Sequence, residues 1–135
     1  MKKLNRIGLG LVFGLAILMV KPLIAHHSFD AEYDSKKLMT VTGYVTKLDW
    51  VNPHAWIFLD VKDDAGNVTS WACELGSPNL LMRNGWKRES LKTGDSVVVT
   101  GSAAKDGSHI ASARTVRLGD GKRIFNAGSS GDQQQ

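Results

Sequence analysis

Apolar and polar residues alternate along the middle of the chain with the two-residue period of a β-strand. In residues 54–61, Ala55, Ile57, Leu59 and Val61 fall on one face, while His54, Trp56, Phe58 and Asp60 fall on the other. Similar stretches occupy residues 39–50, 68–75, 96–101 and 109–118, and turn-forming residues such as Asp106-Gly107 separate them. The pattern predicts an all-β domain.

One helix interrupts the predicted strands. Ser77 suits the N-cap, Pro78 suits the first turn, and Asn84-Gly85 suits the end of a helix of about two turns. Three strands, a helix and two more strands follow the order of an OB-type barrel, and Gly43 predicts a bulge or sharp bend in a long first strand. We therefore predict a small OB-like five-stranded barrel with one short helix. An open β-sandwich, or another small barrel capped by the helix, is the alternative.

The first 25 residues have the three parts of a secretory signal. Lys2, Lys3 and Arg6 precede an uncharged stretch over residues 7–20, and cleavage is predicted after Ala25. That stretch is shorter than the roughly 20 residues of a spanning helix, although an uncleaved anchor is the alternative. We expect four segments: a cleaved signal peptide (1–25), a polar N-terminal arm (26–37), the OB-like β-barrel domain (38–125) and a disordered tail (126–135).

The predicted leader decides the charge of the exported protein. The chain has 17 basic and 13 acidic residues, and four basic ones lie in the leader, so 13 of each remain after cleavage. Non-specific nucleic-acid binding needs a surplus of Lys and Arg, and we therefore expect no nucleic-acid partner. The expected location is periplasmic or secreted, with membrane contact only through the signal peptide during export. Cys73 is the single cysteine, which excludes an internal disulfide and predicts a buried thiol.

Several short motifs are shared with a known group of sequences. They are AHHSF at residues 25–29, the strand around Gly43, NPHAW at 52–56, WACELGSPNLLMRNGW at 71–86 and TGD at 93–95. In these motifs the chain resembles a family of small uncharacterised secreted bacterial proteins, a domain of unknown function. The resemblance implies an exported OB-like domain. It supplies no activity and no catalytic residue.

The histidines are candidate metal ligands. Cleavage after Ala25 leaves His26 at the new N-terminus, where its amine and imidazole together can chelate a metal ion. His27 or His54 then completes a set of nitrogen ligands that suits copper as Cu(II), with Zn(II) or Ni(II) as alternatives. No compact motif such as HExxH or CxxC is present. In the structural alternative, His26 and His27 are solvated and His54 bonds locally, while His109 is expected on the surface.

The face opposite the predicted core of residues 54–61 is a candidate ligand-binding surface. Trp56 and Phe58 point away from the core beside His54, on a part of the surface that OB domains use for binding. Exposed aromatic residues in a neutral domain suit a sugar, a peptide or a protein better than a polyanion. In the alternative, the N-terminal arm covers this face through Phe29 and Tyr33, and so carries His26 and His27 towards His54.

Catalytic patterns are weak in this chain. No nucleophile elbow and no glycine loop for phosphate is present, and the acidic residues near Asp63 form a turn rather than an acid–base pair. We therefore expect an exported β-barrel binding or accessory module, more a binder than an enzyme, whose partner is a periplasmic protein, a peptide or a small ligand. The alternative is a periplasmic copper-type metal-binding protein that uses the mature N-terminal histidine.

Overall fold

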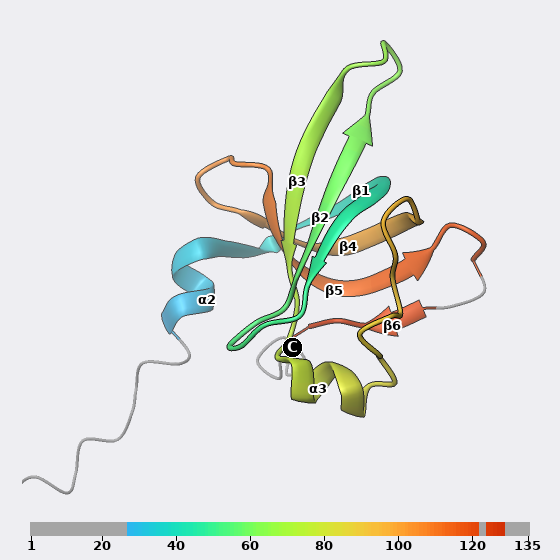
Figure 1. Ribbon diagram of the computed structural model, residues 1–135. Coiled ribbons are helices and arrows are strands. Elements are labelled where there is room, and N and C mark those ends of the chain that lie inside the picture. Colours follow the sequence, from blue (N-terminus) through green and yellow to red (C-terminus); the bar gives the residue numbers. More distant parts are fainter. Residues whose placement is uncertain (1–26, 122–123, 129–135) are drawn as a thin grey trace, which may run out of the picture.

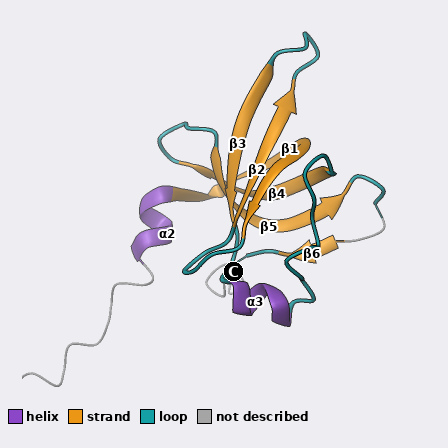
Figure 2. Cartoon of the chain, viewed as in Figure 1, coloured by secondary structure: helices purple, strands orange, loops and turns teal. Residues whose placement is uncertain are grey.

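Strands dominate the protein, as the alternating pattern predicts. The computed structural model describes residues 27–121 and 124–128. Its elements follow in the order α2 (His27–Glu32), β1 (Tyr33–Asp49), β2 (Trp56–Lys62), β3 (Val68–Glu74), α3 (Pro78–Arg83), β4 (Ser96–Ala104), β5 (Ile110–Leu118) and β6 (Ile124–Asn126). Figures 1 and 2 show α2 to the left of the strands and α3 below them, with the β2–β3 hairpin extending upward away from the rest. No helix in the described ranges is long and apolar enough to cross a membrane.

The six strands form one sheet in the order β3-β2-β1-β4-β5-β6. The long strand β1 serves two partners, because its first part pairs with β4 and its second part, from Tyr44 onward, pairs with β2. A further parallel pairing joins β3 to β5 through Ala72, Cys73 and Glu74. The pairings among β1 to β5 therefore form a complete circuit, with β6 attached to β5.

Close backbone approach explains two glycines in this circuit. A Cβ atom on Gly43 would lie 2.7 Å from the carbonyl oxygen of Asp60, so Gly43 admits close contact between β1 and β2. The β1–β2 register shift lies two residues further on, between Val45 and Lys47, and not at the glycine itself. A Cβ on Gly101 would lie only 2.0 Å from a backbone oxygen of Ser112, where the β4–β5 register also shifts.

The alternation predicted for residues 54–61 is confirmed in the core. Ala55, Ile57 and Leu59 are fully buried, whereas Trp56 and Phe58 on the opposite face are half-buried. The core also contains residues of β4 and β5 together with Leu81 and Trp86 from α3 and the segment after it. Cys73 is buried as predicted, and desolvation raises the pKa of its thiol to about 12.

Helix α3 begins and ends where the sequence predicts. The Ser77 hydroxyl accepts a hydrogen bond from the Leu80 backbone N–H at 3.3 Å, and Asn84 follows the last helical residue. The Trp86 indole, just beyond, donates to the carbonyl of Asn126 at 3.0 Å, and its ring lies 4.7 Å from that of Phe125. These contacts attach β6 to the region of α3.

Residues on both sides of the predicted domain, 38–125, take part in the folded structure. Residues 27–37, expected as a polar arm, form a helix and the first part of β1, because Tyr33 is buried and pairs with Ala104. In the segment expected as a tail, Ala127 is fully buried and its carbonyl accepts a bond from the Gly76 N–H at 2.7 Å. Within the described ranges the structure has six strands and two helices, of which β6 and α2 are additional to the predicted five strands and one helix. The signal peptide and residues 129–135 lie outside the described residues.

Candidate functional site

Strand register brings two rows of side chains together on the outer face of β2, β3 and β5. Phe58 pairs with Ala72, which pairs in turn with Ile110. In the neighbouring row, Trp56 pairs with Glu74, which pairs with Ser112. Directly opposed residues of paired strands point to the same face, so an apolar row lies beside a row that contains Glu74.

Trp56 lines a pocket of about 540 Å³. Ala31 and Glu32 of α2 and Tyr33 at the start of β1 form one part of its wall. The remainder comes from Ala104, from the β4–β5 connection (Lys105, Asp106 and Ser108) and from Ile110. Pockets of 300–1,000 Å³ with aromatic and apolar walls are typical small-molecule sites, so its size and composition suit a ligand.

A chain of polar contacts lies behind one wall of this pocket. The Tyr33 hydroxyl, on a residue only 4% exposed, donates a 2.5 Å hydrogen bond to Oε2 of Glu74. The other carboxylate oxygen of Glu74 contacts Nδ1 of His54. Burial, together with the bond and the negative charge of Glu74, raises the pKa of Tyr33 well above its usual range. Tyr33 is therefore a neutral donor that orients Glu74, which in turn orients His54.

Helix α2 is fixed against the β4–β5 connection by Lys105. The Lys105 ammonium donates to the carbonyl of Asp30, and the Lys105 backbone N–H donates to the carbonyl of Glu32 at 2.9 Å. The Phe29 ring lies 5.3 Å from the Tyr33 ring. The N-terminal segment and Trp56 therefore border the same pocket, through Ala31, Glu32 and Tyr33 on one side, and Trp56 itself is half-buried.

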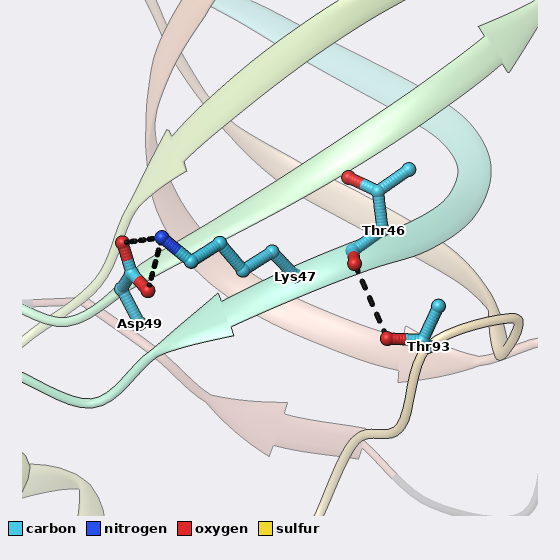
Figure 3. A network of polar contacts seen from close by, with 4 residues as sticks. All are labelled: Thr46, Lys47, Asp49 and Thr93. Carbon is cyan, nitrogen blue, oxygen red and sulfur yellow. Dashed lines mark hydrogen bonds and ion pairs between the residues drawn. The ribbon is translucent and has the colours of Figure 1, made fainter.

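Phe58 lies apart from the pocket on the same face. Its strand partner Lys47 places an ammonium 5.5 Å from the ring centroid and forms an ion pair of 2.8 Å with Asp49. Figure 3 shows this pair beside the contact of Thr93 with β1, a 3.2 Å hydrogen bond from its hydroxyl to the Thr46 carbonyl. The two predicted ligand-binding residues thus have different surroundings, since Trp56 lines the cavity and Phe58 is partly covered by a lysine.

The candidate metal ligands are only partly placed by the structure. His26 and the side chain of His27 lie outside its described part. The His54 side chain is 41% exposed, with one ring nitrogen on Glu74. His109 is exposed, as predicted, with its ring 5.1 Å from that of Trp71. Among the described residues, no group of three or more His, Cys, Asp or Glu side chains could hold a metal ion.

The sequence interpretation missed Glu74 and the loop residues Lys105 and Asp106. A signal for Glu74 was present, because it is the one acidic residue of the stretch WACEL and alternates with Cys73 and Leu75. Such a residue beside buried neighbours must lie on the outer face. No local signal identifies Lys105 or Asp106, whose place in the pocket depends on the pairing of β4 with β1.

Comparison with known proteins adds a family and no activity. No curated protein matches the chain. Residues 15–113 match a family of unknown function, DUF6152, and this segment includes β1, β2, β3, α3 and β4. Because the matched segment covers more than half of the chain, the protein belongs to this family of unknown function.

Proposed function

We propose that the protein is an exported binding module whose ligand site is the pocket at Trp56. The observation that carries the proposal is the cavity of about 540 Å³ between α2, Trp56 and the β4–β5 connection. Its volume falls in the range of small-molecule sites, and its walls combine aromatic and apolar groups with a few charged ones. Export rests on the predicted signal peptide and places the module in the periplasm or outside the cell.

The strand pairings support an OB-like barrel as the scaffold of this site. The circuit β1-β2-β3-β5-β4, with a long first strand shared by β2 and β4, is the arrangement expected for such a barrel. OB-like domains bind ligands on the face of strands 2 and 3 and on the loops after strands 1 and 4. The Trp56 pocket uses β2 and the β4–β5 connection, which correspond to those positions.

Phe58 extends the proposed site for a longer ligand. It pairs with Ala72, and Ala72 pairs with Ile110 of the pocket wall. A small ligand would need Trp56 alone, whereas an extended peptide would also cross Ala72 to reach Phe58. The effect of removing the Phe58 ring therefore distinguishes a small molecule from a peptide.

The binding proposal is tested with N-phenyl-1-naphthylamine, a neutral probe whose fluorescence rises in apolar sites. We expect the mature protein to enhance its fluorescence and Trp56→Ala to abolish the enhancement. Tyr44→Ala is the matched control, because Tyr44 is 57% exposed and does not line the pocket. Circular dichroism verifies that the variants are folded. Absence of enhancement by the folded wild-type protein, or equal loss in both variants, would refute the pocket as the binding site.

A metal-binding function is the second candidate, and the Glu74–His54 contact favours it. Histidines that bind metals commonly place their second ring nitrogen on a carboxylate, which fixes the orientation of the ring. Glu74 bonds Nδ1 of His54 in this way and leaves Nε2 for a metal. In this proposal, His26 and His27 at the mature N-terminus supply further ligands, and Cu(II) is the metal best suited to them.

Native mass spectrometry of the exported protein with added Cu(II), then Zn(II), tests this second candidate. We expect a mature chain that begins at His26 and one retained copper, which His26→Ala and His54→Ala both release. His109→Ala, with its exposed ring on Trp71, is the control and should keep the metal. A different N-terminus, or copper retained by His54→Ala, would contradict the proposed ligand set.

A further inference from the structure

The wall of the Trp56 pocket combines aromatic rings with carboxylates. Trp56 and Tyr33 supply the rings, and Glu32 and Asp106 supply the carboxylates. Building on the proposed ligand-binding role of this pocket, we propose that its ligand is a small organic cation. The chemical class is an alkylated ammonium that carries an apolar substituent.

The rings favour a cation because aromatic faces carry partial negative charge. Tryptophan is the strongest such partner, and clustered aromatic side chains are the usual binding site for quaternary ammonium groups. Trp56 is half-buried at the pocket and is the ring available to such a group. Tyr33, only 4% exposed, contributes mainly through its 2.5 Å hydrogen bond to the carboxylate of Glu74.

The charges around the cavity also favour a cationic ligand. Glu32 and Asp106 line it, and Glu74 adds a third carboxylate behind Tyr33. Asp106 is held by the backbone N–H of Ser108 at 2.9 Å, and hydrogen bonds from Ser108 lower its pKa, which keeps it ionised. Complementary charge of this kind attracts and orients a cationic ligand.

The described residues that line the pocket carry more negative than positive charge. Among them Lys105 is the one cationic residue, and its ammonium, which keeps its charge, donates to the Asp30 carbonyl and is thereby held against α2. His54 contacts Glu74 and does not line the pocket. An anionic ligand would therefore meet two carboxylates of the wall, Glu32 and Asp106, against one ammonium, that of Lys105.

The size of the cavity indicates that the ammonium group carries an apolar substituent. About 540 Å³ exceeds the space that one trimethylammonium group fills, and Ala31, Ala104 and Ile110 offer an apolar surface beside the rings. A cation with an aryl or short alkyl substituent would use both surfaces. Inorganic cations would leave the apolar part of the wall without a partner.

Competition against bound N-phenyl-1-naphthylamine tests the proposal with two ligands of the same shape. Phenyltrimethylammonium carries the positive charge, and tert-butylbenzene is its neutral counterpart. At low fixed ionic strength we expect the cation to displace the probe at a concentration about tenfold lower than the hydrocarbon. In the double variant Glu32→Gln, Asp106→Asn the preference should fall several-fold. Asp64→Asn, in the exposed β2–β3 turn, is the control and should preserve it.

The outcomes separate this inference from the proposed function. If the naphthylamine binds but the neutral ligand competes as well as the cation, the cation proposal is overturned and the pocket remains a binding site. Benzoate serves as an anionic competitor of similar size. The cation proposal is also overturned if benzoate competes better than the cation, or if the double variant keeps the full preference for the cation. If the folded protein binds none of the probes, both proposals fail.

Discussion

The phenol of Tyr33 donates a 2.5 Å hydrogen bond to the carboxylate of Glu74, a residue 41 positions further along the chain. Tyr33 stands where α2 becomes β1, and Glu74 is the last residue of β3. One bond therefore connects the wall of the pocket to the strand that completes the circuit of pairings. It also holds the carboxylate that contacts His54.

Loss of this bond should destabilise the fold measurably. In Tyr33→Phe the ring keeps its packing, but Glu74 loses a buried donor. Hydrogen bonds to charged groups contribute about 1.5–3 kcal/mol, and we expect a decrease of that order in the free energy of unfolding. Urea denaturation measures it, with the exposed Tyr44→Phe as control. Equal stability of the two variants would show that the Tyr33 bond contributes nothing net.

The same tyrosine should make the protein sensitive to alkali. The pKa of Tyr33 is raised in the folded state above the ordinary value of 10.0. At a pH between the unfolded and the folded pKa, the folded protein therefore binds a proton that the unfolded chain has lost. Stability from this group is therefore complete below pH 10 and falls above it, by about 1.4 kcal/mol for each pH unit. Denaturation midpoints from pH 8 to 11 should show this slope in the wild type and a shallower one in Tyr33→Phe. Identical slopes would contradict the assignment.

Lys105 should control the opening of α2. In Lys105→Met the apolar stem remains and the bond to the Asp30 carbonyl is lost, while the backbone bond to Glu32 persists. We expect amide hydrogen exchange in α2 to accelerate about three- to tenfold, as loss of about 1 kcal/mol of local stability implies. Lys47→Met is the control, because Lys47 lies over the Phe58 ring and not beside α2 or the pocket, and it should leave exchange in α2 unchanged. Unchanged exchange in Lys105→Met would mean that the ammonium does not hold the helix.

Gly101 should tolerate no side chain. A methyl group there would lie 2.0 Å from the Ser112 carbonyl oxygen, whereas at Gly43 it would lie 2.7 Å from that of Asp60. Both contacts involve backbone atoms, which cannot rotate away. We expect Gly101→Ala to lower the unfolding free energy by about 3 kcal/mol or more, and Gly43→Ala to cost less. Thermal denaturation ranks the two, and the reverse order would be inconsistent with the β4–β5 geometry.

Cys73 should be inert in the folded protein. It is fully buried, and its pKa of about 12 leaves almost no thiolate at neutral pH. An aromatic disulfide reagent at pH 8 should label it within minutes in guanidinium chloride and only at the rate of unfolding in buffer. Rapid labelling of the native protein would indicate that the β3–β5 region opens without global unfolding.

Local patterns in the sequence predicted local structure well. The alternation around Ile57 identified the buried face of β2, and Ser77 with Pro78 located the start of α3, since both signals need only neighbouring residues. The alternation also identified the face on which Trp56 lies. The pocket itself could not be predicted, because its other walls come from residues about 25 positions earlier and 50 later in the chain.

Composition indicated less about the two ends of the domain. The polar composition of residues 26–37 predicts a polar arm and that of residues 126–135 a disordered tail, and composition does not report pairing with a distant strand. Tyr33 is ordered by Ala104 and Glu74, and Ala127 is ordered by Gly76 and by its N–H bond to the Arg114 carbonyl at 2.8 Å. Burial of Tyr33 in the first segment, and of Ala127 and Gly128 in the second, extends the fold beyond the predicted domain.

No loop separates α2 from β1, since Glu32 ends the helix and Tyr33 begins the strand. The wall of the pocket is thus a direct continuation of the strand that pairs with both β2 and β4. Moving this wall outward would strain the pairing of Tyr33 with Ala104, so the cavity and the sheet form one energetic unit. A ligand that fits would protect the whole sheet against unfolding, and one that is too large would loosen the sheet before it entered.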